Sequence, residues 1–328
     1  MSVLAARVTV MTMTVALCAT VPALAEPLRL SLPLACDYGR TCVVEDYVDA
    51  DPGPGQRDHA CGLKSRDGHR GTDFMLLSFE AMEAGVAVVA AAPGVVAATR
   101  DGMADTPVTA VNRDAIAGRE CGNAVRVDHG DGWQTLYCHL AQGSVTVGPG
   151  DRVARGDTLG AVGLSGLTNA PHLHFGVLQD GRVVDPFAPR ARGTCDAEPG
   201  PGLWEQAPPY TPTGLFTAGF STAVPAFDAV RSGAARAVEA PAGAALVLYG
   251  HVFHARPGDR LTLSAHGPGG EIFRHAVTLE APRKQLFRAY GRKAPPEGWP
   301  PGAYRGHVRL WRGDRLIATR HADIAVRP

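Results

Sequence analysis

Short apolar runs separated by polar turn residues extend over most of the chain. Between residues 68 and 186 these runs are bounded by Gly, Pro and Asp, as β-strands commonly are. We expect strands here at residues 72–77, 86–92, 95–100, 124–128, 135–140, 158–162 and 173–178. A long polar insertion, residues 103–120, is expected to be a loop with one helical turn near Asp114. The pattern predicts an all-β domain over residues 68–196.

Strands resume after a Pro-rich stretch, residues 197–214, which is the expected linker. The later strands are predicted at residues 245–254, 260–265, 271–279, 304–311 and 316–326. Several of them alternate apolar with polar residues, as the half-buried strands of a sandwich do. We therefore expect an immunoglobulin-like β-sandwich accessory domain over residues 215–328.

Residues 1–25 have the pattern of a signal peptide. Arg7 precedes an apolar run, residues 8–19, and a small-x-small cleavage site ends at Ala25. The run is too short to cross a membrane permanently, and no later run is long enough. We expect a periplasmic or secreted protein, cleaved near Ala25, and not an integral membrane protein. Cys18 follows a bulky residue, which argues against lipidation.

The composition limits the possible functions. The 328 residues are 45% hydrophobic, which is enough to bury more than one core. The 39 glycines and 26 prolines suit many turns rather than long helices. The 32 basic and 32 acidic residues give no net charge, which argues against a general nucleic-acid binder. Residues 26–67 are polar and weakly periodic, and we expect them to form a wrapped N-terminal segment.

Removal of the signal peptide leaves six cysteines, namely Cys36, Cys42, Cys61, Cys121, Cys138 and Cys195. An even number in an exported chain indicates disulfides. The strands around the Gly-rich turn at residues 129–132 form a hairpin that brings Cys121 close to Cys138. Cys36 and Cys42 are near enough in sequence to close a short loop, which leaves Cys61 and Cys195 as the remaining pair. The chain has no Cys-x-x-Cys, so a zinc site made of thiolates is disfavoured.

Two short stretches contain side chains that can hold a metal ion. In Gly-His-Arg-Gly-Thr-Asp, His69 and Asp73 are four positions apart and would lie on one face of an extended strand. In His-Leu-His, the spacing of two puts His172 and His174 on one face. Two imidazoles and one carboxylate suit a tetrahedral zinc that keeps its fourth position for water.

A third stretch, Leu-Tyr-Cys-His-Leu, is expected to present Tyr137 and His139 together on one face of a strand. Each stretch alone is a weak signal, but together they predict one concave site on a sheet. The chain has no His-Glu-x-x-His, so no helical glutamate is available as a base. Imidazoles would have to move the protons instead.

These three stretches resemble the motif set of the lysostaphin-type (LytM-type) zinc endopeptidases, which cut peptide cross-links in bacterial peptidoglycan. The resemblance covers about residues 68–186. It implies one zinc ion per chain, held by His69, Asp73 and His174, and two catalytic histidines, His139 and His172. It also implies an antiparallel β-sandwich of the duplicated-hybrid-motif type and a peptidoglycan peptide substrate. Gly176 departs from the family, in which a Glu is frequent at this place.

Two other functions compete with this interpretation. The turns around residues 86–96 and 147–163 are similar to those of biotinyl or lipoyl carrier domains, which need a lysine at a hairpin tip. Because no lysine lies between Lys64 and Lys284, the carrier function is rejected. The alternative that stays open is a catalytically inactive protein that binds peptidoglycan or activates a hydrolase. The presence of all five motif residues favours an enzyme.

Overall fold

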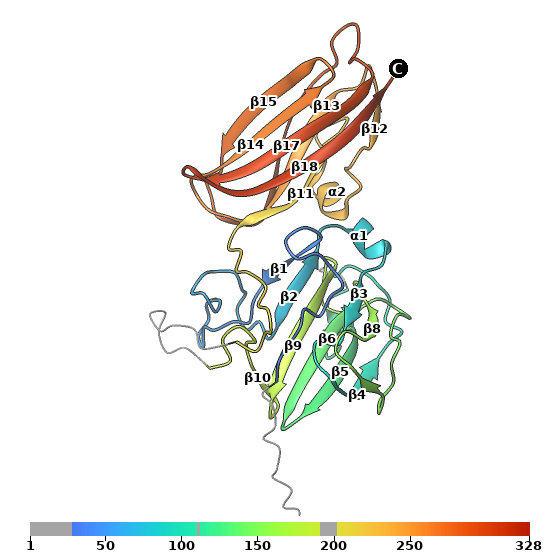
Figure 1. Cartoon of the computed structure of the whole chain (residues 1–328), viewed down its shortest axis with the longest axis vertical. Coiled ribbons are helices and arrows are strands. Elements are labelled where there is room, and N and C mark those ends of the chain that lie inside the picture. Colours follow the sequence, from blue (N-terminus) through green and yellow to red (C-terminus); the bar gives the residue numbers. More distant parts are fainter. Residues whose placement is uncertain (1–27, 110–111, 191–201) are drawn as a thin grey trace, which may run out of the picture.

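The computed structural model describes residues 28–109, 112–190 and 202–328. Within these residues the protein is built of β-sheets with only short helices, so the predicted all-β class is confirmed. The strands form two domains that follow one another along the long axis of the molecule (Figure 1). The expected signal peptide, Cys195 and residues 197–201 of the expected linker lie outside the described residues. None of the described helices is long and apolar enough to cross a membrane.

The first domain contains one large sheet in which the paired strands are antiparallel. In spatial order its strands are β1 (Cys42–Asp46), β2 (Thr72–Leu76), β9 (His172–Gln179), β6 (Trp133–Leu140), β5 (Asn123–Gly130), β4 (Gly94–Arg100) and β7 (Arg152–Val153), with β10 (Arg182–Val183) paired to β9. A separate two-stranded sheet joins β3 (Ala87–Val89) and β8 (Thr158–Ala161). The short helix α1 (Phe79–Glu83) follows β2, and the insertion carries one 3₁₀ turn, η1 (Asp114–Ile116).

The core of this domain lies between the large sheet and the small one. Phe74, Tyr137 and Phe175 are fully buried from one side, and Val88 and Leu159 from the other. Trp204 comes from the expected linker, yet it is buried against Phe74 and Phe175. The expected wrapped segment likewise supplies β1, the edge strand next to β2.

The second domain consists of two sheets packed face to face. One has the order β11 (Gly214–Ser221), β13 (Leu246–Ala255) and β16 (Arg283–Arg292). The other has the order β12 (Glu239–Pro241), β18 (Arg315–Arg327), β17 (Gly302–Arg312), β14 (Asp259–Gly267) and β15 (Gly270–Thr278). Leu248 and Val252 of the first sheet share a buried cluster with Leu263 and Val308 of the second. The domain is a β-sandwich, and its immunoglobulin-like character stays a prediction.

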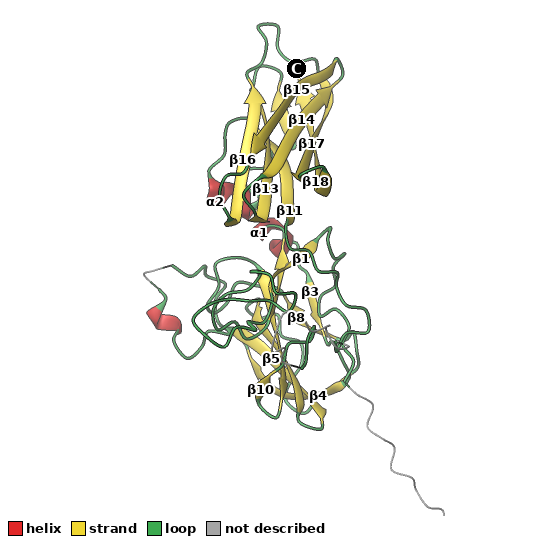
Figure 2. Ribbon diagram, turned by 90° about the vertical axis from the view of Figure 1, so that its left-hand side faces the viewer, coloured by secondary structure: helices red, strands yellow, loops and turns green. Residues whose placement is uncertain are grey.

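The two domains are in direct contact. Figure 2 shows α1 of the first domain close to α2 (Phe227–Ser232) of the second. A small buried cluster crosses the boundary, with Met75 of β2 packed near Phe216 and Phe253. The second domain therefore packs on the first through buried apolar side chains.

The structure contains two of the predicted disulfides. Cys36 pairs with Cys42. Cys121 pairs with Cys138, with 4.9 Å between their Cα atoms, and so ties the end of the insertion to β6. Cys61 is also disulfide-bonded, whereas Cys195 lies outside the described residues.

Candidate metal centre

Strand pairing brings the predicted metal ligands together. Asp73 on β2 lies directly opposite His174 on β9, and Met75 lies opposite His172. Strand β6 pairs with the other edge of β9, with Cys138 opposite His174. Because directly opposed residues in antiparallel strands have neighbouring side chains on one face, Asp73 and His174 point to the same place.

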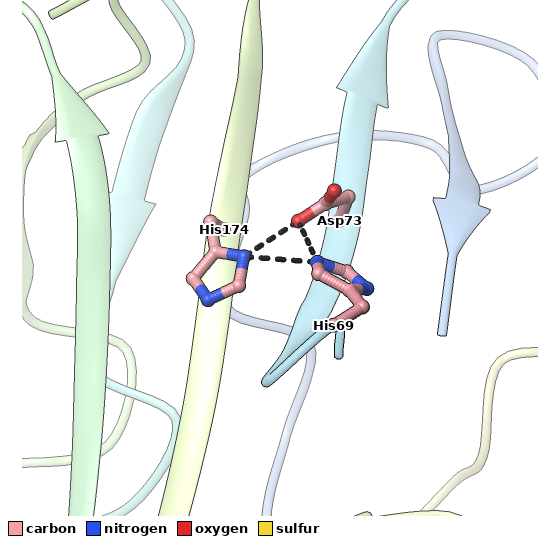
Figure 3. Close-up of side chains that lie close together, drawn as sticks. All are labelled: His69, Asp73 and His174. Carbon is pink, nitrogen blue, oxygen red and sulfur yellow. Dashed lines mark hydrogen bonds and ion pairs between the residues drawn. The ribbon is translucent and has the colours of Figure 1, made fainter. Parts of the chain in front are cut away.

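Three side chains converge at this place, as Figure 3 shows. His174 Nδ1 is 2.8 Å from Asp73 Oδ1, and His69 Nε2 is 3.1 Å from the same oxygen. The two ring nitrogens are 3.2 Å apart. Their potential ligand atoms all lie within 4.8 Å of one another. Asp73 and His69 are buried, and His174 is only partly exposed.

His69 reaches the cluster by a route that the sequence did not predict. It does not lie on a strand, since β2 begins only at Thr72, so the expected strand alternation does not place it. Its Nδ1–H donates a 2.7 Å hydrogen bond to the carbonyl of Tyr47. The backbone N–H of Asp49 donates to the carbonyl of His69. These contacts fix the loop and direct Nε2 towards Asp73.

The donor set fits a divalent metal ion. The hydrogen bond to Tyr47 occupies Nδ1 of His69, so the lone pair of Nε2 faces Nδ1 of His174 and Oδ1 of Asp73. Two imidazole nitrogens and one carboxylate oxygen are ligands that zinc accepts in sites that retain an open position. A hydrogen-bonded outer partner on a ligand histidine is typical of such sites.

The carboxylate of Asp73 is kept charged. Burial alone would favour its neutral form, but His69, His172 and the hydrogen bond from His174 hold its pKa well below the usual value. Its second oxygen, Oδ2, accepts a 2.7 Å hydrogen bond from the guanidinium of Arg66, with which it forms an ion pair. A charged carboxylate is the form that binds a metal ion.

Arg66 is the middle of a chain of ion pairs that the sequence did not reveal. The same Nη1 that contacts Asp73 lies 2.5 Å from Oδ2 of Asp46 on β1, a fully buried carboxylate. Lys284 of β16, in the second domain, reaches that oxygen at 2.6 Å. Lys284 stands 238 positions after Asp46, so only the folded structure shows that they meet.

His139 and His172 stand beside the cluster. Their ring centroids are 4.7 Å apart, and the His139 ring is 6.0 Å from that of His174. The Nδ1–H of His139 donates to the carbonyl of Ser165 at 2.8 Å, and that of His172 donates to the carbonyl of Ala170 at 2.9 Å. In each neutral ring the lone pair of Nε2 is therefore available to accept a hydrogen bond or a proton.

Tyr137 does not share a face with His139, contrary to the expectation. Tyr137 points into the core, where its hydroxyl accepts from the N–H of Ala91 and meets the Thr135 hydroxyl. Strand alternation would send His139 the same way. His139 has a φ of 64°, which breaks the alternation and lets its ring reach the metal-ligand face.

Both histidines are buried in a way that favours the neutral form. Burial, helped by His172 and His174, lowers the pKa of His139 well below its usual value. Burial also lowers the pKa of His172. Within the described part of the chain, Nε2 of His172 is buried without a hydrogen-bond partner and lies 3.7 Å from Asp73 Oδ1. Neutral imidazoles can accept a proton, which charged ones cannot.

Two cavities flank the cluster. One, of about 630 Å³, is lined by His69, His139 and His174. The other, of about 680 Å³, is lined by Asp73 and His172. The candidate metal ligands therefore stand between two open spaces, as they would in the middle of a cleft that binds a chain on both sides.

The comparisons with known proteins agree with this geometry. The family model described as Peptidase family M23 matches residues 67–186. This segment of the chain is therefore similar to peptidase family M23. The match confirms the resemblance to the lysostaphin-type peptidases, since it spans all five motif residues.

Similar proteins include a peptidoglycan endopeptidase and a cell division protein. The chain is 32% identical over 117 residues to the peptidoglycan DD-endopeptidase ShyA of Vibrio cholerae serotype O1, a match that covers 36% of this chain and 22% of ShyA. It is 40% identical over 89 residues to the cell division protein DipM of Caulobacter vibrioides, which covers 26% of this chain and 14% of DipM. This chain thus spans about a fifth or less of these relatives.

A crystal structure of a zinc containing peptidase from Vibrio cholerae is also similar to this chain. The identity is 23%, the alignment covers 49% of this chain and 39% of that one, and the TM-score is 0.31.

Proposed function

We propose that the protein is an exported, zinc-dependent endopeptidase that hydrolyses peptide cross-links of bacterial peptidoglycan. The observation that carries the proposal is the convergence of His69, Asp73 and His174 between two cavities, with two further imidazoles beside them. A cleft that is open on both sides of the cluster suits cleavage within a chain. The relatives named as peptidoglycan endopeptidases favour this substrate.

In this proposal His69, Asp73 and His174 hold one zinc ion. The bound ion would supply Lewis acidity, which makes water a usable nucleophile near neutral pH. His139 and His172 do the proton work, because both are neutral and each has Nε2 free for it. The substrate carbonyl would lie within reach of these two rings. The ring that has accepted the proton of the attacking water would then donate a hydrogen bond to the developing oxyanion.

Export of the mature chain also forms part of the proposal. It is supported by the signal-peptide pattern of residues 1–25 and by the disulfides Cys36–Cys42 and Cys121–Cys138. Disulfides form and persist in oxidising compartments, among them the bacterial periplasm and the cell exterior.

The metal assignment is tested by the zinc content of purified variants. We expect one zinc per chain in the mature protein and its loss from His69→Ala, Asp73→Ala and His174→Ala, because each removes one of three ligands. His321→Ala serves as control, since His321 is an exposed histidine of the second domain. Full zinc in all three ligand variants, measured by elemental analysis, would refute the assignment.

A further inference from the structure

The larger of the two cavities is not made by the M23 domain alone. Asp73 and His172 line it, and so does Arg113 of the insertion. Phe227 and Arg231 of α2, in the second domain, also line it. The space beside the candidate metal centre is thus lined by three parts of the chain.

More cationic than anionic side chains line this cavity. Four are cationic, from Arg66, Arg113, Arg231 and Lys284, and two are carboxylates, from Glu45 and Asp73. Arg66 and Lys284 are already used, since both are ion-paired to the buried Asp46. The positive charge that is left for a ligand therefore comes from Arg231 and Arg113.

Arg231 is held in place without being neutralised by a buried acid. One of its Nη atoms donates to the carbonyl of Asn169 at 3.1 Å, and the guanidinium lies 5.9 Å from the centre of the Phe227 ring. Its nearest carboxylate, Asp228, is 3.8 Å away on a side chain that is 94% exposed. An exposed pair of this kind contributes little, because water screens it.

The contact with Asn169 places the guanidinium of Arg231 near His172. Asn169 lies three positions before His172, in the loop whose Ala170 carbonyl orients the His172 ring. Arg231 thus borders the same loop as a proposed catalytic imidazole while remaining in a different domain. Among the described residues, Arg113 has no ion-pair partner, and it adds a second positive charge to the cavity.

We propose that this cavity is a substrate subsite in which Arg231 of the second domain binds a carboxylate of the peptide substrate. The proposal rests on the proposed function, since it takes the substrate to be a peptide cut at the metal centre. A guanidinium recognises a carboxylate through paired charge-assisted hydrogen bonds. The second domain would then select the substrate, and acidic peptides would bind better than neutral ones.

Binding of a defined peptide tests the subsite. The probe is a cross-linked peptide dimer released from purified peptidoglycan, used with its carboxylates free and with these carboxylates converted to amides. Affinities are measured by calorimetry on the full-length, zinc-loaded protein in a His139→Ala background, so that the dimer is not consumed. Arg231→Met is compared with Arg236→Met, an arginine of the same domain that pairs with Glu80 across the domain boundary and does not line the cavity.

We expect Arg231→Met to weaken binding of the free-carboxylate dimer by at least about tenfold. Binding of the amidated dimer should stay the same, Arg236→Met should change neither, and Arg231→Lys should restore part of the affinity. Equal losses for both dimers, an equal loss in Arg236→Met, or no binding by the parent would overturn the subsite. If the parent discriminates between the dimers while the wild-type protein cuts neither, the proposed function fails and the subsite stands.

Discussion

His139 has a backbone conformation that few residues with a side chain adopt. Its φ of 64° lies in the left-handed region, at a cost of about 1 kcal/mol or more. The hydrogen bond to Ser165 and the Cys121–Cys138 disulfide next to it hold this conformation. The backbone N–H of His139 also donates to the carbonyl of Cys121. These contacts aim the ring at the metal-ligand cluster, which strand alternation alone would not do.

Replacing either off-metal imidazole should separate metal binding from turnover. We expect His139→Ala and His172→Ala to keep their zinc, because neither side chain is in the ligand cluster. Turnover should fall by about 10²–10⁴, the usual contribution of one acid–base group. Zinc content, melting temperature and peptidoglycan cleavage are measured on the same preparations. A His172→Ala protein with near-normal cleavage, or one that has lost its zinc, would contradict these roles.

The buried His251 of β13 should make the folding stability of the protein depend on pH. Burial, with a smaller contribution from Arg231, lowers its pKa to about 4. In the unfolded chain this histidine has an ordinary pKa near 6.5. Between about pH 6.5 and pH 4 it is therefore protonated in the unfolded chain but stays neutral in the folded protein. Stability is therefore complete above this window and falls as the pH drops through it.

We expect the wild-type protein to lose about 2 kcal/mol more stability than His251→Gln between pH 7.5 and pH 4.5. Urea unfolding at both pH values measures this difference, with His321→Gln as an exposed control. Should His251→Gln not fold, an NMR titration of the wild-type ring gives the same information. Parallel losses in both proteins, or a ring that titrates near pH 6.5, would show that His251 is not held neutral.

At the scale of elements, the sequence predicted most of the strands that carry the site. The expected strands at residues 72–77, 135–140 and 173–178 agree with β2, β6 and β9, since each has a clear apolar pattern. The edge strand β1 was missed because its five residues include Glu45 and Asp46, which look like solvent-facing positions. Both carboxylates are instead buried, and Lys284 of the second domain pairs with them.

The chain of ion pairs from β16 to β2 could not be predicted for the same reason. Burial opposes the charge on Lys284, but Glu45 and Asp46 outweigh it and raise its pKa. Arg66 is likewise kept charged between Asp46 and Asp73, and its pKa is raised. Such a pattern exists only once the strands have met, and no local motif encodes it.

Lys284→Met should weaken metal binding from a distance. Without Lys284, the buried Asp46 relies mainly on Arg66 for its ion pairing and competes with Asp73 for it. We expect zinc affinity to fall by about tenfold, a usual effect for groups that support metal ligands. Zinc affinity is measured by competition with a chelator, and Lys293→Met, an exposed lysine just after β16, is the control. Equal zinc affinity in the two variants would show that Lys284 of β16 does not influence the metal centre.

At the scale of the whole molecule, the second domain is part of the cleft. Phe216 and Phe253 pack near Met75 of β2, and Lys64 donates to the Thr211 carbonyl of the connecting segment at 2.7 Å. The five motif residues identified the first domain from the sequence, because each chemical role needs a particular side chain. The role of the second domain had no such motif, since its contribution depends on packing.

In the proposed function, zinc held by His69, Asp73 and His174 supports hydrolysis of peptidoglycan cross-links. Digestion of purified peptidoglycan by the mature protein, with the released fragments identified by mass spectrometry, tests this role of zinc directly. We predict fragments cut within the peptide cross-links, their disappearance on treatment with a chelator, and their return when zinc is added. Cleavage that persists in the chelator would contradict the metal assignment, and a zinc-loaded protein that binds peptidoglycan without releasing fragments would contradict the enzyme.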